Sequence, residues 1–289
     1  MRERLAFATL TVFAALAIVV WGLLPGKVIG DRSTASARTS AHSSASPSAS
    51  PSPSTPGLTS NMHLVFDAKF PGSALDGSVW DTCYPWADQS EGCTNFGNAT
   101  KEVEWYLPSQ VQVSGGVLNL TATREATSGL TKAGSPKVYE CRSGMVTTHP
   151  GFNFKYGYVQ VVAHITNGAD LWPALWLAAS DLKWPPEIDI LEHWGPPRDS
   201  SGMFFHPIGA GQVVQPLPYD VTTGWQKLAI DWTASKITWY LNDRAIFSVT
   251  QHVPHQKMYF IANVAAYKTK GYNACSGTLE IRSVKVWQN

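Results

Sequence analysis

The stretch Trp184–Gly195, "WPPEIDILEHWG", places three carboxylic acids among the apolar residues of a β-strand. Because successive side chains of a strand point to opposite faces, Glu187 and Asp189 share one face, whereas Glu192 falls on the other. On that other face Glu192 would be an unpaired charge in the packed interior, which is costly. One extra residue near Ile190–Leu191, a β-bulge, re-phases the strand. We therefore predict a bulged strand with all three acids on one face.

A helix suits this stretch less well than a strand. Side chains of a helix are separated by about 100° per residue, so the three acids would point in different directions. Pro185 and Pro186 also resist a helix that enters from upstream. Two structural alternatives to a catalytic role remain for the acids: a salt-bridged edge strand and a calcium site built from carboxylates.

Alternating patterns with a period of two dominate the rest of the chain. They include "YGYVQVVAHI" (156–165), "QVQVSGGVLNLTAT" (110–123) and "KITWYL" (236–241), which the turn Asn242-Asp243 joins to "RAIFSV" in a hairpin. No segment of ten or more residues carries a helical stripe. The sequence therefore predicts an all-β domain, a sandwich or jelly roll of two antiparallel sheets with a polar cleft along one concave face.

The first sixty residues differ in composition from this domain. The uncharged run Leu5–Leu24 is about long enough to span a bilayer and longer than the apolar core of most signal peptides. It predicts a signal peptide or signal-anchor over residues 1–30, with the anchor favoured, and either one exports the rest of the chain. Residues 31–60 are rich in Ser, Ala, Thr and Pro and predict a disordered linker. One domain remains, at 61–289, attached to the membrane only through the N-terminal segment.

Composition also limits the class of partner. The 289 residues carry a formal net charge of +1 and include 15% charged and 44% hydrophobic residues. This composition excludes a chain that is disordered throughout, and the near-neutral charge argues against nucleic-acid binding.

Four cysteines fall in the predicted domain, and four cysteines allow three pairings. An even number in an exported domain favours disulfides. The most economical pairing joins Cys83 to Cys93 in a local loop and leaves Cys141 with Cys275. A zinc site is the alternative, but no C-x-x-C pair or histidine cluster supports it.

The geometry of the three acids favours glycoside hydrolysis. Two glutamates on a bulged strand can bring their carboxyl groups to the ~5–5.5 Å separation of a retaining double displacement. One carboxylate attacks the anomeric carbon, while the other protonates the leaving oxygen and later activates water. Neighbouring carboxylates push their pKa values apart, which suits the two roles. An aspartate between them can hydrogen-bond the nucleophile.

The motif "EIDILE" (187–192) resembles the active-site strand of glycoside hydrolase family 16, the retaining endo-β-glycanases that include laminarinases and lichenases. Its two residues between aspartate and second glutamate match the bulged, laminarinase-like form. "FDAKFPGSALDGSVWD" (66–81), "LWPALWL" (171–177) and "VKVWQN" (284–289) extend the resemblance, which covers about 62–289. The resemblance implies a concanavalin A-like jelly roll, with Glu187 as nucleophile, Glu192 as general acid/base and Asp189 as supporting acid.

The resemblance also implies an activity. We expect an exported, monomeric, retaining endo-β-glycanase that acts on a polysaccharide, first of all a β-1,3- or β-1,3-1,4-glucan. A transglycosylase on the same scaffold and a non-catalytic, lectin-like glycan-binding domain are the alternatives. Arg282 stands where an aspartate often helps to hold a structural calcium in this family, so we expect no cofactor, and a structural calcium stays as the alternative.

Four further side chains are candidates for sugar binding. Trp172 and Trp176 lie four residues apart and share a strand face, and Trp194 follows Glu192 by two residues. His206 lies on the next predicted strand, where the resemblance places a histidine near the sugar beside the scissile bond. Core packing is the alternative for each tryptophan, and a structural role is the alternative for the histidine.

Overall fold

The computed structural model describes residues 57–87, 92–95, 102–196, 198–267 and 275–289. The predicted anchor at 1–30 and the predicted linker at 31–60, except its last residues from Gly57 onward, lie outside these ranges. All described residues belong to one compact unit, Pro51–Asn289. Among them, no helix is long and apolar enough to cross a membrane.

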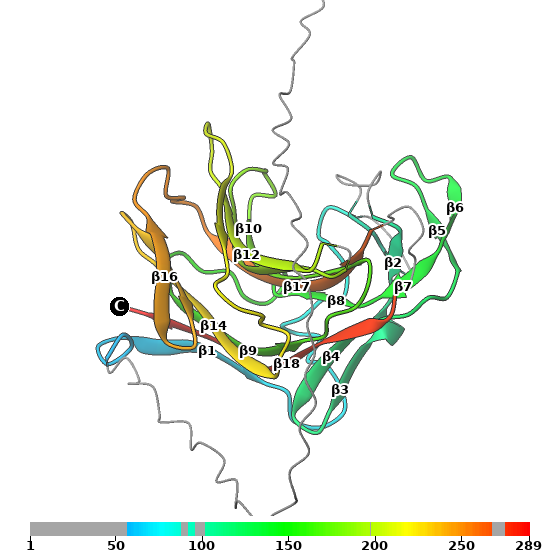
Figure 1. The fold of residues 1–289 in the computed structure, drawn as a ribbon, viewed down its shortest axis with the longest axis horizontal. Coiled ribbons are helices and arrows are strands. Elements are labelled where there is room, and N and C mark those ends of the chain that lie inside the picture. The colour runs from blue at the N-terminus through cyan, green and yellow to red at the C-terminus, as the bar shows by residue number, and fades with distance from the viewer. Residues whose placement is uncertain (1–56, 88–91, 96–101, 197, 268–274) are drawn as a thin grey trace, which may run out of the picture. The chain divides into compact units, whose positions relative to one another are not determined.

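Two large antiparallel sheets form the domain (Figure 1). The eight-stranded sheet has the order β16-β15-β14-β9-β18-β4-β3, with β1 also paired to β18. Its strands are β1 (His63–Lys69), β3 (Val111–Ser114), β4 (Val117–Ala122), β9 (Gly157–Ile165), β14 (Trp225–Trp232), β15 (Ile237–Leu241), β16 (Arg244–Val249) and β18 (Gly277–Gln288).

The six-stranded sheet has the order β13-β12-β11-β10-β17-β8. Its strands are β8 (Met145–Thr147), β10 (Leu171–Ala179), β11 (Glu187–Trp194), β12 (Ser200–His206), β13 (Val213–Pro216) and β17 (Met258–Ala266). Two small sheets complete the described part, one of β2 (Glu104–Tyr106) with β7 (Cys141–Ser143) and one of β5 (Thr127–Leu130) with β6 (Pro136–Tyr139).

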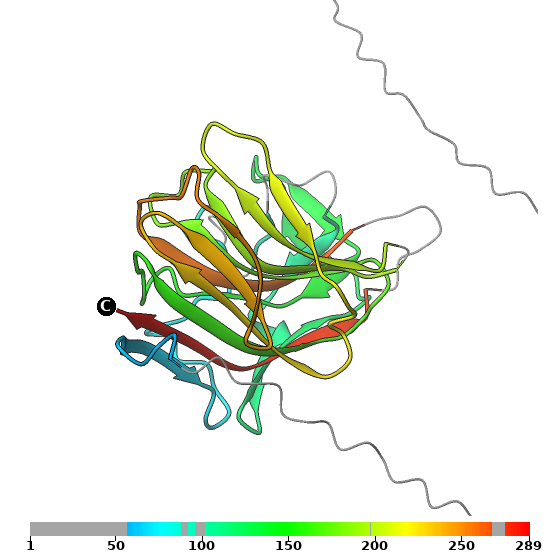
Figure 2. The same ribbon diagram turned by 60° about the vertical axis from the view of Figure 1, so that its left-hand side comes forward.

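The main core lies between the two large sheets, which form two layers in both views (Figures 1 and 2). Trp232 and Trp239 enter it from the eight-stranded sheet, and Leu175, Ile188 and Phe205 enter it from the six-stranded sheet. Burying a large apolar side chain contributes about 1.5–3 kcal/mol, so this layer dominates the stability of the fold. The predicted all-β sandwich is therefore confirmed.

The six-stranded sheet also carries buried aromatic residues on its outer face, the face turned away from this core. Trp176 of β10 and Tyr259 of β17 pack there with Tyr84 and Tyr106. Because both faces of β10 and β17 are covered, these strands read as nearly continuous apolar runs instead of alternating ones.

Both predicted disulfides are present. Cys83 pairs with Cys93, and Cys141 pairs with Cys275. The first joins residues 10 positions apart, whereas the second joins residues 134 positions apart.

Removing the long-range disulfide is expected to destabilise the domain more than removing the local one. In the chain-entropy model, the stabilisation by a disulfide grows with the logarithm of the number of residues in the loop that it closes. The contributions of the two bonds to the unfolding free energy therefore differ by roughly 2 kcal/mol. Guanidinium unfolding of Cys141→Ala/Cys275→Ala and of the matched Cys83→Ala/Cys93→Ala protein measures the difference. Equal losses of unfolding free energy would contradict this ranking.

Candidate active site

The central strand β11 contains the predicted bulge. Asp189 pairs with Trp176 of β10, but Leu191 pairs with the adjacent Leu175, so Ile190 has no partner on that strand. The register of β11 against β12 shifts over the same residues. Ile190 and Leu191 are both buried in the core between the sheets. The bulge thus turns two consecutive apolar side chains inward and leaves the three acids on the outer face.

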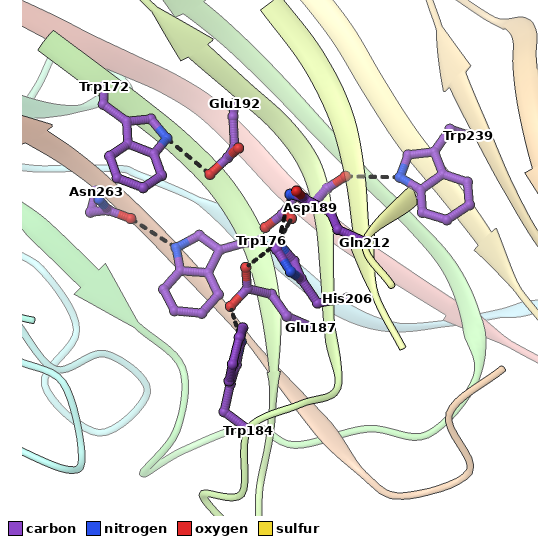
Figure 3. Close-up of polar contacts among 10 residues, drawn as sticks. All are labelled: Trp172, Trp176, Trp184, Glu187, Asp189, Glu192, His206, Gln212, Trp239 and Asn263. Atoms are coloured by element: carbon purple, nitrogen blue, oxygen red, sulfur yellow. Dashed lines mark hydrogen bonds and ion pairs between the residues drawn. The ribbon is translucent and has the colours of Figure 1, made fainter. Parts of the chain in front are cut away.

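A tryptophan from the opposite sheet supports the bulge. A bulge disrupts the hydrogen-bond ladder and leaves backbone groups that need other partners. The indole Nε1 of Trp239, on β15, donates a 2.8 Å hydrogen bond to the backbone oxygen of Asp189 (Figure 3). Trp239 is completely buried, so this bond crosses the core and holds the strand at the bulge.

Glu187 lies at the start of β11, and the side chains of Trp184, Asp189 and His206 lie around its carboxyl. Trp184 Nε1 donates a 3.0 Å hydrogen bond to its Oε2, and His206 Nε2 lies 3.4 Å from its Oε1 (Figure 3). His206 is directly opposite Glu187 on β12. Burial raises the pKa of Glu187 to about 7, while hydrogen bonds from Trp184 and Asp189 oppose the rise.

Asp189 is the most deeply buried of the three acids, at 1% exposure. Burial raises its pKa well above the ordinary range, and the negative charges of Glu187 and Glu192 raise it further. A side-chain hydrogen bond joins Asp189 to Glu187. The strongly raised pKa of Asp189 favours a protonated aspartate, which can donate this bond to the Glu187 carboxylate.

Glu192 is 6% exposed and faces the other acids across the bulge. Trp172 Nε1 donates a 2.9 Å hydrogen bond to its Oε1 (Figure 3). Burial and the charge of Glu187 raise the pKa of Glu192 to about 8, and the bond from Trp172 opposes them. The pKa of Glu192 is thus raised further than that of Glu187, which favours an ionised Glu187 beside a protonated Glu192.

The family of the chain follows from its similarity to known proteins. The model of glycosyl hydrolases family 16 matches residues 99–275, more than half of the sequence. The chain belongs to glycoside hydrolase family 16. The endo-1,3-1,4-beta-glycanase EglC of Rhizobium meliloti is 32% identical over 200 residues, which are 65% of this chain and 42% of EglC.

A second relative of this family 16 chain is the glucan endo-1,3-beta-glucosidase A1 of Niallia circulans, 28% identical over 217 residues. The match covers 66% of this chain and 30% of that enzyme, so the chain spans less than half the length of either relative.

Solved structures share the fold. The endo-1,3-beta-glucanase (laminarinase) catalytic domain of Thermotoga petrophila superimposes with a TM-score of 0.65 at 23% identity, covering 79% of this chain and 98% of that one. The laminarinase of Rhodothermus marinus gives the same TM-score and identity over 78% and 97%. The family 16 jelly roll predicted from the sequence is therefore the fold of this chain.

Two of the predicted sugar-binding tryptophans of this family 16 chain lie together on the outer face. Trp172 and Trp194 stack with ring centroids 3.8 Å apart and planes 22° apart. Tyr267 meets the edge of Trp194, and the Arg198 guanidinium lies 4.3 Å from its ring centroid. Trp172 and Trp194 are both half-buried, and their contact with sugar stays a prediction.

Trp176 shares the outer face but is more enclosed. It is 8% exposed, packs near Tyr84 and Trp86, and donates a 2.8 Å hydrogen bond from Nε1 to Asn263 Oδ1. Its predicted role as a sugar platform is untested, and little of its surface is open for it.

His206 lies beside the acids, on the strand next to β11 as predicted, and its contact with sugar stays a prediction. Burial lowers its pKa, so the ring is neutral at pH 7, and its Nε2 lies 3.1 Å from Gln212 Nε2. A neutral ring nitrogen can accept the amide hydrogen of Gln212. Glu187, Asp189 and His206 also offer three potential metal-ligand atoms, all within 4.8 Å of one another.

Besides Trp239, three side-chain partners in the described part of the site were not found from the sequence. Trp184 is 67% exposed yet bonds Glu187, Gln212 bonds His206 from the β12–β13 connection, and Asn263 bonds Trp176. An aromatic residue three positions before the first acid was the available signal for Trp184. Nothing in the local pattern marks Gln212 or Asn263, because their partners lie on other segments.

Replacing Glu192 with glutamine is expected to raise the melting temperature more at pH 9 than at pH 5. The folded protein raises the pKa of this carboxyl from 4.5 to about 8, so its stabilising contribution is complete below pH 4.5 and is lost as the pH rises through 8. Glutamine cannot ionise and avoids this loss. Each kcal/mol gained corresponds to roughly 2–4 °C in a domain of this size.

Calorimetry at both pH values measures this effect. The control is Glu125→Gln, whose side chain is 60% exposed in an ion pair with Arg142. A change in melting temperature that is equal at pH 5 and pH 9 would contradict the assignment of a raised pKa to Glu192.

Proposed function

We propose that this chain is a retaining endo-β-glucanase that cleaves β-1,3- or β-1,3-1,4-glucans by double displacement. The observation that carries the proposal is the bulge in β11, which sets Glu187, Asp189 and Glu192 on one face. The different pKa values of the two glutamates, and the protonated aspartate between them, match what the two roles require.

In the first step the Glu187 carboxylate attacks the anomeric carbon of the bound glucan. The bond from that carbon to the leaving oxygen breaks, and the proton of Glu192 passes to this oxygen. Asp189 and Trp184 hydrogen-bond the Glu187 carboxyl, so its charge is oriented before attack. A covalent glycosyl-enzyme and a shortened glucan result.

In the second step a water molecule attacks the same carbon from the side that the leaving group vacated. Glu192, now ionised, accepts a proton from the water, and the bond to Glu187 breaks. Two inversions restore the original β configuration, and Glu192 regains the proton that the next cycle needs.

The names of the relatives support the choice of substrate. EglC is an endo-1,3-1,4-beta-glycanase, and the Niallia circulans enzyme is a glucan endo-1,3-beta-glucosidase. The two-residue spacing of the motif points to the same subgroup. We extend this substrate class to the present chain as a proposal.

We further propose that the domain holds no structural calcium at the position of Arg282. On β18, the guanidinium of Arg282 lies 3.7 Å from the ring centroid of Trp225. A fixed cation at this position does not suit a calcium ion, which prefers carboxylate and carbonyl oxygens.

We also propose that the domain acts outside the cytoplasm, held by its N-terminal apolar segment. The two disulfides support an oxidising compartment. Fractionation of cells that express the full chain tests the tether, which predicts that the enzyme sediments with membranes and is lost from them when residues 1–30 are deleted.

The decisive experiment incubates residues 57–289 with laminarin, mixed-linkage β-glucan, xyloglucan and agarose, with and without EDTA. We expect oligosaccharides from the first two substrates, unchanged by the chelator and absent with Glu187→Ala. Binding without cleavage by the wild type would favour a lectin. Products longer than the substrate would favour a transglycosylase, and loss of activity in EDTA would favour a calcium-dependent site.

A further inference from the structure

The indole of Trp172 contacts the acid/base directly. Its Nε1 lies 2.9 Å from Oε1 of Glu192, within the range of a charge-assisted hydrogen bond. Trp172 is on β10, opposite Ala265 of β17, so the donor comes from a neighbouring strand and not from the motif itself. One of the two Glu192 oxygens therefore has a fixed partner.

The ring of Trp172 is itself held in place. Trp194 stacks on it at 3.8 Å, and Tyr267 packs against the edge of Trp194. The Tyr267 hydroxyl donates a 2.8 Å hydrogen bond to the backbone oxygen of Gly195, and the Arg198 guanidinium lies over the rings of Trp194 and Tyr267. One face of the Trp172 ring is thus covered by Trp194, and its N–H is engaged by Glu192.

We propose that Trp172 is a positioning residue for the general acid/base, whose N–H holds Oε1 of Glu192 throughout the reaction so that Oε2 carries and transfers the proton. The proposal rests on the proposed double displacement. In the first step the proton leaves Oε2 for the glycosidic oxygen, and in the second a water proton returns to Oε2. The bond to Oε1 persists in both steps and stabilises the transient carboxylate.

Within the described ranges, Trp172 is the side-chain donor that stabilises the Glu192 carboxylate. Directly opposite Glu192 lie Ala174 on β10 and Gly202 on β12, which carry no charge. Among the described residues, the ionisable groups close to Glu192 in sequence or in the sheet include Glu187, Asp189 and His193 on β11 and His206 on β12, with Arg198 after β11 and Tyr267 after β17. Glu187 raises the pKa of Glu192, whereas the Trp172 bond lowers it.

The first test measures the Glu192 carboxyl without substrate. In protein labelled with ¹³C-glutamate, the Glu192 signal is assigned by its absence in Glu192→Gln and titrated in wild type, Trp172→Phe and Trp176→Phe. Trp176→Phe is the matched control, because it removes an indole donor from the same strand face that serves Asn263 instead. We expect Trp172→Phe to raise the pKa of Glu192 by about one unit and the control to leave it unchanged. An unchanged pKa in Trp172→Phe would overturn the proposal.

A second measurement needs no substitution at Trp172. In ¹⁵N-tryptophan protein, the indole N–H signal of Trp172 should shift with pH along the titration of Glu192, and this shift should vanish in Glu192→Gln. An indole N–H signal whose position does not follow the titration of Glu192 would contradict the hydrogen bond, even if Trp172→Phe failed to fold.

The kinetic test separates proton transfer from sugar contact. On laminarin, Trp172→Phe is expected to lose roughly tenfold or more in kcat/KM, since general acid catalysis is worth about 10²–10⁴-fold. On a 2,4-dinitrophenyl laminaribioside, whose leaving group needs no proton, the first-step loss should largely disappear. An equal loss on both substrates would assign Trp172 to sugar binding and overturn the proposal. A wild type inactive on every glucan would refute the proposed function, while the two titrations would still decide the role of Trp172.

Discussion

Glu187→Ala is expected to lower kcat on laminarin by roughly 10⁴-fold or more, because the covalent route is lost with its nucleophile. Added azide should restore turnover by occupying the space of the missing carboxyl. Since azide attacks once and from the side opposite the leaving group, the product should be the inverted α-glycosyl azide. Kinetics of laminarin cleavage and NMR of the azide product provide the measurement.

The control for this substitution is Glu125→Ala, which removes an exposed carboxyl that forms an ion pair with Arg142. Its activity should stay within about twofold of the wild type, as for most surface substitutions. A Glu187→Ala protein that folds and retains more than a tenth of wild-type activity would exclude Glu187 as the nucleophile.

Glu192→Ala should fail differently, because it removes the proton donor but leaves the nucleophile. On laminarin we expect kcat/KM to fall by about 10²–10⁴-fold. On an activated aryl glycoside the glycosyl-enzyme should form and then accumulate, since no base activates water. Azide needs no base and should release the retained β-glycosyl azide.

The configurations of the two azide products thus show which glutamate is the nucleophile and which is the general acid/base. An α-azide from Glu192→Ala, or a β-azide from Glu187→Ala, would exchange their roles. Equal losses on laminarin and on the activated aryl glycoside in Glu192→Ala would show that Glu192 is not the general acid.

The central features of the site could be predicted from the local sequence. The spacing of Glu187, Asp189 and Glu192 conflicts with strand alternation, and the bulge at Ile190 resolves the conflict as expected. Period-two patterns also located strands such as β9 and the β15–β16 hairpin. Such features are encoded within a few consecutive residues, so no knowledge of the tertiary fold was needed.

The partners of the acids could not be predicted in the same way. Trp239 supports the bulge from a position 50 residues away, and Asn263 bonds Trp176 across 87 residues. Trp172 was predicted to reach the acids' face, but its hydrogen bond to Glu192 depends on the packing of β10 against β11. These contacts follow from sheet order, which local periodicity does not specify.

The pKa values of the acids also depend on the fold. The sequence predicted that Glu187 and Glu192 would titrate apart, but the depth of burial that raises both pKa values comes from the layers around β11. The same burial makes the site costly for stability at alkaline pH, which is the physical reason for the expected gain in Glu192→Gln.

The anomeric form of the first product distinguishes a double from a single displacement. Hydrolysis of laminarin or mixed-linkage glucan followed by ¹H NMR, at times shorter than mutarotation, reports which anomer the enzyme releases. A double displacement through Glu187 and Glu192 predicts that the β-anomer appears first and the α-anomer grows in later. Initial release of the α-anomer would show a single displacement and would contradict the assignment of Glu187 as nucleophile.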